Sequence, residues 1–266
     1  MAQATEPGIL VRIDQRKGGA RIAYLTIHNP RKLNTLTSRL MNDFAGAIEG
    51  LAGEATLRAL VLTGAGDRAF IGGADIDEMA GLDSGSAGAF ISRLHRCCDA
   101  LRKLPVPVIG RIQGYALGAG LEIAAACDLR VAADTAQFGM PEVRLGIPSV
   151  IEAALLPALV GWGRARQILL LGEDFTAVQA EAWGLIERVV PMEKLDDAVE
   201  SLIQSLLQAG PRAVRLQKKL IQAWEDLPLS AAVEAGVAAF VSAWETDEPR
   251  QMMTEFQAAR RRRNSM

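Results

Sequence analysis

The residues with the clearest potential for chemistry are two glutamates that follow glycine-containing turns, Glu122 and Glu142. Glu122 lies in the stretch GYALGAGLEIAAACD (residues 114–128), where it is the only charged residue before Asp128. The apolar run after Glu122 predicts a helix that is buried on nearly all sides. A carboxylate in such a helix needs a partner or a function, because burying an unpaired charge costs free energy. The alternative is a simple helix-start acid that interacts with the helix dipole.

The start of this helix also offers backbone donors. Gly118, Ala119 and Gly120 occupy its first positions, and the first four N–H groups of a helix have no partner within the helix. They lie where the dipole contributes roughly half a positive charge. Such a site favours an oxygen that becomes anionic during a reaction.

Glu142 is the second candidate acid, in the stretch FGMPEVRLGIP (residues 138–148). It directly follows Pro141, and proline fixes the direction of the chain, so a stiff turn presents the carboxylate. On this segment alone, a solvated loop acid is the simpler interpretation. The spacing along the chain does not show whether Glu142 meets Glu122 in space.

A glycine pair marks a third segment, AFIGGADIDEM (residues 69–79). Gly72 and Gly73 allow the backbone to pass close to another group. A short helix can begin with Asp75 as its N-cap, which leaves the N–H before it free to face a ligand; a glycine-rich surface loop is the alternative. The GxGxxA pattern that starts at Gly64 is typical of dinucleotide-binding turns. Here the glycine pair interrupts the long helix that such a site requires.

The elements that must position these residues alternate between strands and helices up to about residue 194. Runs rich in β-branched residues predict strands, and amphipathic or apolar periodic runs predict helices. We expect strands at residues 9–14, 20–28, 58–64, 107–112, 127–134 and 188–191, and helices after Thr37 and at residues 87–104, 151–161 and 163–172. Beyond residue 194 only helical patterns remain. The sequence therefore predicts an α/β core over residues 1–195 and a helical C-terminal region over residues 196–266.

The composition excludes several classes of protein. A net charge of −2 gives no sign of a nucleic-acid binder. Three cysteines, two of them the neighbours Cys97 and Cys98, argue against a disulfide framework and fit a reducing cytoplasm. No uncharged apolar stretch approaches the roughly 18 residues of a membrane span, and the N-terminus lacks a signal-peptide pattern. His28 and His95 have no metal-ligand spacing, so we expect no metal site and acid–base chemistry by carboxylates or lysine.

Together these segments resemble the enoyl-CoA hydratase/isomerase (crotonase) superfamily. The matching stretches are NPRKLNTL, LVLTGAGDRAFIGGADIDEM, PVIGRIQGYALGAGLEIAAACDLRVAADTAQFGMPEVRLGIP and AWGLIERVVP, which occur in family order over about residues 29–191. The resemblance implies a spiral of ββα units with a C-terminal helical oligomerisation region, and a homo-oligomer that is a trimer or a dimer of trimers. It also implies an acyl-CoA thioester substrate, so coenzyme A is part of the substrate and no separate cofactor is expected.

The resemblance also implies roles for residues of this sequence. Ala74 and Ala119 match the two backbone N–H groups of an oxyanion hole, and Glu122 and Glu142 match the two acids of hydratases. Ala119 stands where glycine is common, a change that keeps the N–H. Two loops match CoA-contacting backbone, with Arg31, Lys32, Leu33, Gly72, Gly73, Asp75 and Ile76. Phe256 and the arginines after it resemble the tail that reaches a neighbouring subunit's CoA.

The presence of two acids favours hydration of a 2-enoyl-CoA, or the reverse dehydration. Water adds to Cβ and a proton to Cα, while backbone donors stabilise the charge on the thioester oxygen. We expect Glu122, kept ionised by the helix start, to be the principal base and Glu142 to be the proton donor, although a coupled pair need not divide its roles cleanly. The alternatives are an isomerase, a C–C bond-cleaving enzyme, a dehydratase of a branched or unusual acyl-CoA, or an RNA-binding member without catalysis.

One segment departs from the family pattern. After Gly146, many hydratases have a glycine-rich stretch, whereas this chain has PSVIEAALLP (residues 148–157) with the bulkier Val150, Ile151 and Glu152. If this segment lines the acyl pocket, the preferred acyl group is short, branched or heteroatom-bearing rather than a common straight chain. We expect Glu152 to be a solvated acid at a helix start.

Overall fold

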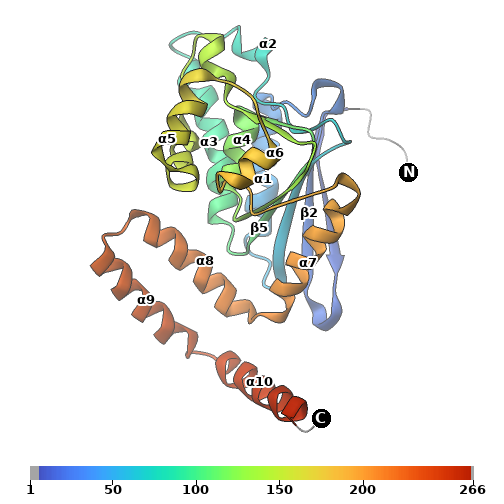
Figure 1. The fold of residues 1–266 in the computed structure, drawn as a ribbon, viewed down its shortest axis with the longest axis vertical. Helices are drawn as coiled ribbons and strands as arrows, with labels where there is room; N and C mark the ends of the chain where they lie inside the picture. Colours follow the sequence, from blue (N-terminus) through green and yellow to red (C-terminus); the bar gives the residue numbers. More distant parts are fainter. Residues whose placement is uncertain (1–5, 265–266) are drawn as a thin grey trace.

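The chain folds around two β-sheets that are built from alternating strands (Figure 1). The structure is a computed structural model, and it describes residues 6–264. The larger sheet has the strand order β1-β2-β3-β5-β7-β10 and the smaller sheet the order β4-β6-β8-β9. The strands are β1 (Gly8–Gln15), β2 (Arg21–His28), β3 (Leu57–Gly64), β4 (Ala69–Ile71), β5 (Val108–Ile112), β6 (Tyr115–Leu117), β7 (Leu129–Ala133), β8 (Gln137–Gly139), β9 (Phe175–Thr176) and β10 (Arg188–Val190).

Three successive strand pairs each add one strand to each sheet. In the pairs β3 and β4, β5 and β6, and β7 and β8, the first strand joins the larger sheet and the second joins the smaller one. A helical segment follows each pair. Strand β1 is antiparallel to β2, and the other neighbours in the larger sheet are parallel. The predicted spiral of ββα units is therefore confirmed.

Helices cover the sheets and continue to the C-terminal end. The α-helices are α1 (Ser38–Leu51), α2 (Ile76–Met79), α3 (Ala87–Lys103), α4 (Ala119–Ala126), α5 (Leu156–Leu171), α6 (Ala177–Ala182), α7 (Leu195–Gln208), α8 (Pro211–Asp226), α9 (Leu229–Ala243) and α10 (Glu248–Asn264). The 3-10 helices are η1 (Lys17–Gly19), η2 (Pro30–Lys32), η3 (Pro141–Leu145), η4 (Ile151–Leu155) and η5 (Met192–Lys194). The first of the two helices expected within residues 151–172 begins as η4 and continues into α5. The non-helical Gly161 (φ 75°, ψ 155°) interrupts α5 where the two helices were expected to separate. Among the helices of residues 6–264, none combines the length and hydropathy that a bilayer crossing requires.

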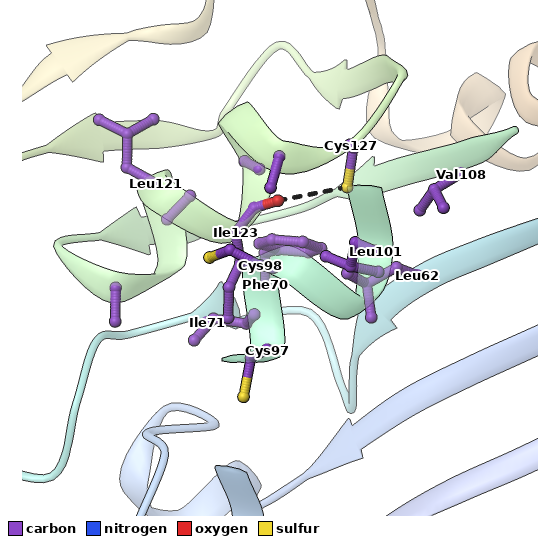
Figure 2. Close-up of a cluster of buried hydrophobic side chains, with 14 of the residues drawn as sticks. Leu62, Phe70, Ile71, Cys97, Cys98, Leu101, Val108, Leu121, Ile123 and Cys127 are labelled. Carbon is purple, nitrogen blue, oxygen red and sulfur yellow. Dashed lines mark hydrogen bonds between the residues drawn. The ribbon is translucent and has the colours of Figure 1, made fainter. Parts of the chain in front are cut away.

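The main hydrophobic core brings together side chains from both sheets, α1, α3 and α4. Figure 2 shows its centre, where Phe70 and Ile71 of β4 lie beside Cys97 and Cys98 of α3 and Ile123 of α4. Every residue of α4 is buried, as its alanine-rich sequence predicts. This core fixes α4, and with it the predicted acid, against β4 and α3.

A second apolar layer lies between the larger sheet and α7. Leu195, Val199 and Ile203 of α7 pack with Val61 and Val131 of the sheet. Helix α7 therefore covers the sheet, whereas α8, α9 and α10 extend away from it as an arm (Figure 1). The division of the chain into residues 1–195 and 196–266 stays a prediction.

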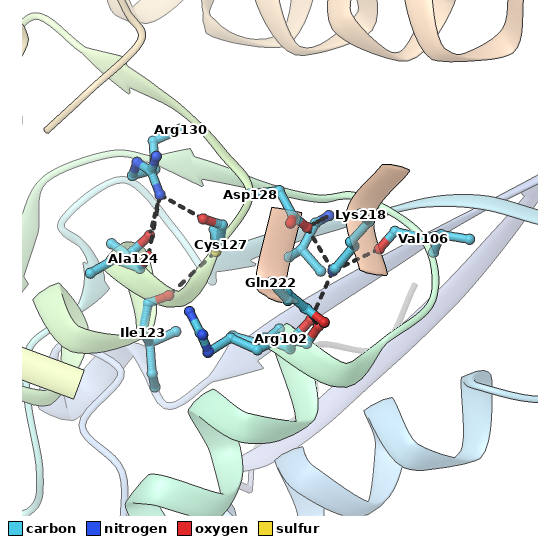
Figure 3. A network of polar contacts seen from close by, with 12 residues as sticks. Arg102, Val106, Ile123, Ala124, Cys127, Asp128, Arg130, Lys218 and Gln222 are labelled. Atoms are coloured by element: carbon cyan, nitrogen blue, oxygen red, sulfur yellow. Dashed lines mark hydrogen bonds and ion pairs between the residues drawn. The ribbon is translucent and has the colours of Figure 1, made fainter. Parts of the chain in front are cut away.

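Buried polar contacts fix α8 to the core (Figure 3). The Lys218 ammonium group, on α8, donates to the Asp128 carboxylate at 2.7 Å and to the carbonyls of Leu101 and Val106 at 3.0 Å. Burial lowers the pKa of Lys218 below its ordinary value, because desolvation disfavours the charged form. Beside this cluster, the Arg130 guanidinium donates to the last carbonyls of α4, a favourable place for a cation. Together these contacts hold the base of the arm and the C-terminal end of α4.

Candidate active site

Three neighbouring strands of the smaller sheet end at one place. β4 pairs in parallel with β6, and β6 pairs in parallel with β8, so their carboxyl ends lie at the same edge. The segment Gly72–Ala74 follows β4, helix α4 follows β6, and η3 follows β8. A hydrogen bond from the Gly118 N–H to the Gly139 carbonyl, 2.9 Å long, joins the last two. Ligands of parallel sheets favour this edge.

A cavity of about 240 Å³ opens between these segments. Both predicted acids, Glu122 and Glu142, line it, and so do the predicted amide donors Ala74 and Ala119. Most of the remaining wall is apolar, with Ile76, Met79, Phe90, Ile91, Leu94, Leu117, Leu145, Ile147 and Val150. The fold thus brings these four residues together in one cavity. Their spacing along the chain did not show that they meet.

The two predicted amide donors are free of other acceptors in the described part of the chain. The Asp75 N–H donates to the Leu36 carbonyl at 2.9 Å, whereas the preceding N–H of Ala74 has no partner within residues 6–264. Ala119 is the first residue of α4, so its N–H lies outside the helical hydrogen-bond ladder. It too lacks an acceptor among the described residues. Both groups are available to an oxygen in the cavity.

The start of α4 depends on two glycines. Gly118 has φ 50° and ψ −118°, a conformation that residues with a side chain rarely adopt, and a Cβ there would lie 2.3 Å from Glu142 Oε1. A Cβ on Gly120 would lie 2.0 Å from the Ile71 carbonyl oxygen. Glycine therefore lets α4 lie directly against β4 and beside Glu142.

Glu122 is buried in the first turn of α4. The residue is 4% exposed, and its Oε1 accepts a hydrogen bond from the Ala153 N–H at 3.2 Å. Burial raises the pKa of Glu122 to about 8, and the charge of Glu142 is the second cause of this rise. This corrects the expectation that the helix start keeps Glu122 ionised, because desolvation outweighs the helix dipole.

Glu142 is half-buried and held by its own loop. Its Oε2 accepts a hydrogen bond from the Ser149 hydroxyl at 2.8 Å, and its carbonyl accepts one from the Ile147 N–H at 3.1 Å. Neither Ser149 nor the Ala153 amide was predicted as a partner of the acids. The only signal for Ser149 was a hydroxyl in a proline-containing loop after Glu142, which is too common to identify a partner.

Glu152 is buried, so the expectation of a solvated acid was wrong. It lies at the start of η4, as expected, but is only 7% exposed. Its Oε1 lies 2.8 Å from Nδ1 of His95, a residue that no sequence pattern linked to Glu152. The reason is that η4 packs against α3 and α4 instead of facing solvent.

The residues expected to contact CoA fall into two groups. Gly72, Gly73 and Ile76 line the cavity. The others do not line it: Arg31, Lys32, Leu33 and Asp75. Lys32 Nζ contacts the carboxylates of Asp75 and Asp77 at 3.0 and 2.8 Å, so its charge is already paired. Phe256 lies on α10 in the arm and is 69% exposed.

Comparison with known proteins gives the same family at the level of sequence and fold. The family model for enoyl-CoA hydratase/isomerase matches residues 17–263. The short-chain-enoyl-CoA hydratase of Clostridium acetobutylicum is 32% identical over 237 residues, which cover 89% of this chain and 91% of that protein. The crotonyl-CoA hydratase of Syntrophomonas wolfei is 34% identical over 240 residues, with 89% and 91% covered.

A solved structure agrees with these relatives. The crystal structure of an enoyl-CoA hydratase from Bacillus anthracis matches with a TM-score of 0.88 at 29% identity, and the match covers 94% of this chain and 96% of that one. The residues that the family model matches include strands β2 to β10 and the segments that form the cavity. The chain therefore belongs to the enoyl-CoA hydratase/isomerase family.

Proposed function

We propose that the protein is an enoyl-CoA hydratase, which adds water reversibly across the 2,3 double bond of a 2-enoyl-CoA thioester. The observation that carries the proposal is the presence of two glutamates, Glu122 and Glu142, in one cavity with the amides of Ala74 and Ala119. Neither amide has an acceptor in the described part of the chain. The relatives named above as hydratases support the same reaction. No cofactor besides the CoA part of the substrate enters the proposal.

The amides of Ala74 and Ala119 stabilise the oxygen of the thioester. As water adds to Cβ, electrons move toward the carbonyl, and negative charge grows on that oxygen. Two N–H groups that have no other acceptor among residues 6–264 can bind the charge without reorganisation, and one such donor is typically worth about 10²–10³ in rate. This role uses the backbone only, which agrees with alanine at both positions.

The glutamates act as a pair that shares one proton. A pKa of about 8 keeps Glu122 mostly protonated at neutral pH in the free protein, so the pair can both accept and donate a proton. The water oxygen forms a bond to Cβ while one water proton passes to the ionised carboxylate. The protonated carboxyl group gives its proton to Cα, and the pair again holds one proton. We assign the roles to the pair because such coupled groups exchange the proton between them.

The cavity wall favours a short, apolar acyl group. Met79 of α2, Phe90 and Leu94 of α3, and Val150 before η4 form much of that wall. The volume of about 240 Å³ is below the roughly 300–1,000 Å³ that is usual for small-molecule sites. The bulky Val150, which stands where many hydratases have a glycine-rich segment, also favours an acyl group with a short carbon chain.

We also propose that the protein is a trimer or a dimer of trimers that is joined through the helical arm. The arm exposes large apolar side chains, among them Leu229 at 82%, Phe240 at 67% and Phe256 at 69%. Exposed apolar patches of this kind mark interaction surfaces. In such an assembly the arm of one chain contacts another chain.

Hydration of crotonyl-CoA by the purified protein tests the proposed reaction. We expect the absorbance of the conjugated enoyl thioester to disappear and a 3-hydroxyacyl-CoA to form. Glu122→Gln and Glu142→Gln should each lower kcat by at least about 10², because each removes one member of the acid–base pair. Binding of the CoA thioester should stay largely unchanged. The control is Glu193→Gln, which changes an exposed glutamate on η5.

Three results would contradict parts of this proposal. If the wild-type protein hydrates no member of a panel of enoyl-CoA thioesters, the assignment as a hydratase is wrong. If the double bond moves but no hydroxyl group is added, the protein is an isomerase. If either glutamine variant keeps full activity, that glutamate has no part in the reaction.

A further inference from the structure

Glu152 is a buried acid that the proposed reaction does not use. Its side chain is 8% exposed, and its Oε2 is buried without a nitrogen or oxygen donor in the described part of the chain. The Cys98 thiol is the weak donor beside the carboxylate. Ile151, just before it, has φ 41°, a conformation that is strained for a β-branched residue. A half-paired buried carboxylate and a strained backbone both reduce stability. They therefore point to a function.

The other oxygen of Glu152 is held by His95 of α3. Nδ1 of His95 lies 2.8 Å from Oε1 of Glu152. The His95 side chain is 55% exposed, so the contact runs from the protein surface to the buried start of η4. It joins two elements that are 57 residues apart in sequence, and it fixes how η4 sits against α3.

The residue after Glu152 contacts the proposed acid directly. The Ala153 N–H is shared between the Val150 carbonyl at 3.0 Å and Glu122 Oε1 at 3.2 Å, and Ala153 is itself buried, at 3% exposure. The position of η4 therefore decides where this donor lies. A shift of η4 would release the Glu122 carboxyl group to turn within the cavity.

We propose that Glu152 is a positioning residue for Glu122: its contact with His95 anchors the start of η4, so that the Ala153 amide holds the Glu122 carboxyl group in its reactive orientation. The inference rests on the proposed function, because it assigns Glu122 to the reaction. Misplacement of a reacting group by about 1 Å can cost about 10² in rate.

Titratable and charged groups from two other elements surround Glu122 and Glu152. η3 contributes Glu142, and α3 contributes His95, Cys97, Cys98 and Arg102. Burial raises the pKa of Cys98 well above its usual value and the pKa of Cys97 to about 12, so both thiols stay neutral. The charges of Glu142 and Glu152 both raise the pKa of Glu122. Neutralising Glu152 should therefore lower it.

The first test is Glu152→Gln, which keeps the shape of the side chain and removes its charge. We expect kcat for crotonyl-CoA hydration to fall by about 10- to 100-fold with KM little changed. The alkaline limb of the kcat/KM profile, where the pair loses its shared proton, should move to lower pH. Carbon NMR of labelled glutamate carboxyl groups in the free protein should show Glu122 titrating at lower pH in Glu152→Gln, where the neighbouring charge is lost, and at higher pH in His95→Ala, where the Ala153 hydrogen bond is lost. The matched control is Glu49→Gln, an exposed glutamate paired with Arg96 of α3, which should change none of these.

His95 provides a second test that spares the buried acid. His95→Ala removes the anchor, whereas His95→Asn keeps a donor near the place of Nδ1. We expect the alanine variant to lose kcat to a similar extent and the asparagine variant to recover most of it. Because the His95 side chain is half exposed, both variants should fold even if Glu152→Gln does not.

Two results would overturn the inference. One is wild-type kcat in Glu152→Gln or in His95→Ala. The other is a kcat loss with unchanged Glu122 titration, an unchanged pH profile and no recovery in His95→Asn, which would mean that Glu152 only supports the fold. The NMR titration does not depend on turnover. An inactive wild type would therefore contradict the proposed function, while the NMR result would still decide whether Glu152 acts on Glu122.

Discussion

At Glu122 two electrostatic effects oppose each other. The start of α4 favours the ionised form, and a helix terminus is typically worth about 0.3–1 kcal/mol. Burial and the charge of Glu142 raise the pKa of Glu122 from 4.5 to about 8, and each pKa unit corresponds to about 1.4 kcal/mol. Desolvation therefore wins over the dipole. The result is a carboxyl group that keeps a proton near neutral pH, which general acid–base chemistry requires.

The same shift predicts a pH-dependent cost to folding. Since the folded state binds this proton more tightly than the unfolded state, stability should fall as pH rises from 4.5 to about 8. Glu122→Gln removes the titration. We expect its free energy of unfolding to exceed that of the wild type by roughly a few kcal/mol above pH 8 and to match it near pH 4. Urea unfolding at several pH values measures the difference, with Glu193→Gln as a control. A stability difference that does not change with pH would contradict the raised pKa.

At the scale of elements, the long helices and the strands of the larger sheet could be predicted from the sequence, and the short strands of the smaller sheet could not. Helix α1 follows from the spacing of Leu40, Met41, Phe44 and Ile48. Strands β4, β6 and β8 have three residues each and β9 has two, too few for an alternating pattern to show. Their existence depends on pairing between distant segments, such as Leu117 with Gly139.

The candidate site could be predicted only in part, because it too depends on pairing between distant segments. The residue types and the family resemblance identified Glu122 and Glu142, but only the parallel pairing of β4, β6 and β8 brings their segments together. The burial of Glu152 follows from the turn at Ile151 and from packing of η4 on α3. Neither feature has a local signal, because helix-start acids are usually exposed.

The start of α4 gives a prediction about Gly118. Gly118→Ala places a Cβ in a strained backbone region and 2.3 Å from Glu142 Oε1. We expect kcat to fall by at least about tenfold, since both the Ala119 amide and Glu142 must move. Stability should fall by about 1 kcal/mol or more. The control is Gly46→Ala in α1, where a Cβ meets nothing within 4 Å, and which should keep activity and gain about 0.5–1 kcal/mol. Wild-type kcat in Gly118→Ala would show that the position of this turn does not matter.

At the scale of the whole molecule, the arm carries an apolar stripe that a single chain leaves uncovered. On α9, Leu229, Val233, Val237, Phe240 and Val241 recur at helical spacing and are 59–82% exposed. Buried contacts of Lys218 hold the base of the arm, and the Trp224 indole N–H donates to the Ala232 carbonyl at 2.9 Å between α8 and α9. A fixed helix with an exposed apolar face requires a partner surface, and a second copy of the chain is the partner that the proposed trimer provides.

The assembly can therefore be tested through α9. Light scattering at micromolar concentration should give three or six chain masses for the wild type. Phe240→Glu places a charge in the middle of the stripe, and burying an unpaired charge at an interface is strongly unfavourable, so we expect a smaller species with the circular dichroism of a folded chain. Leu10→Glu, an equally charged change on β1 outside the arm, should keep the wild-type mass. A monomeric wild type would contradict the oligomer, and an intact oligomer in Phe240→Glu would mean that the subunits join through another surface.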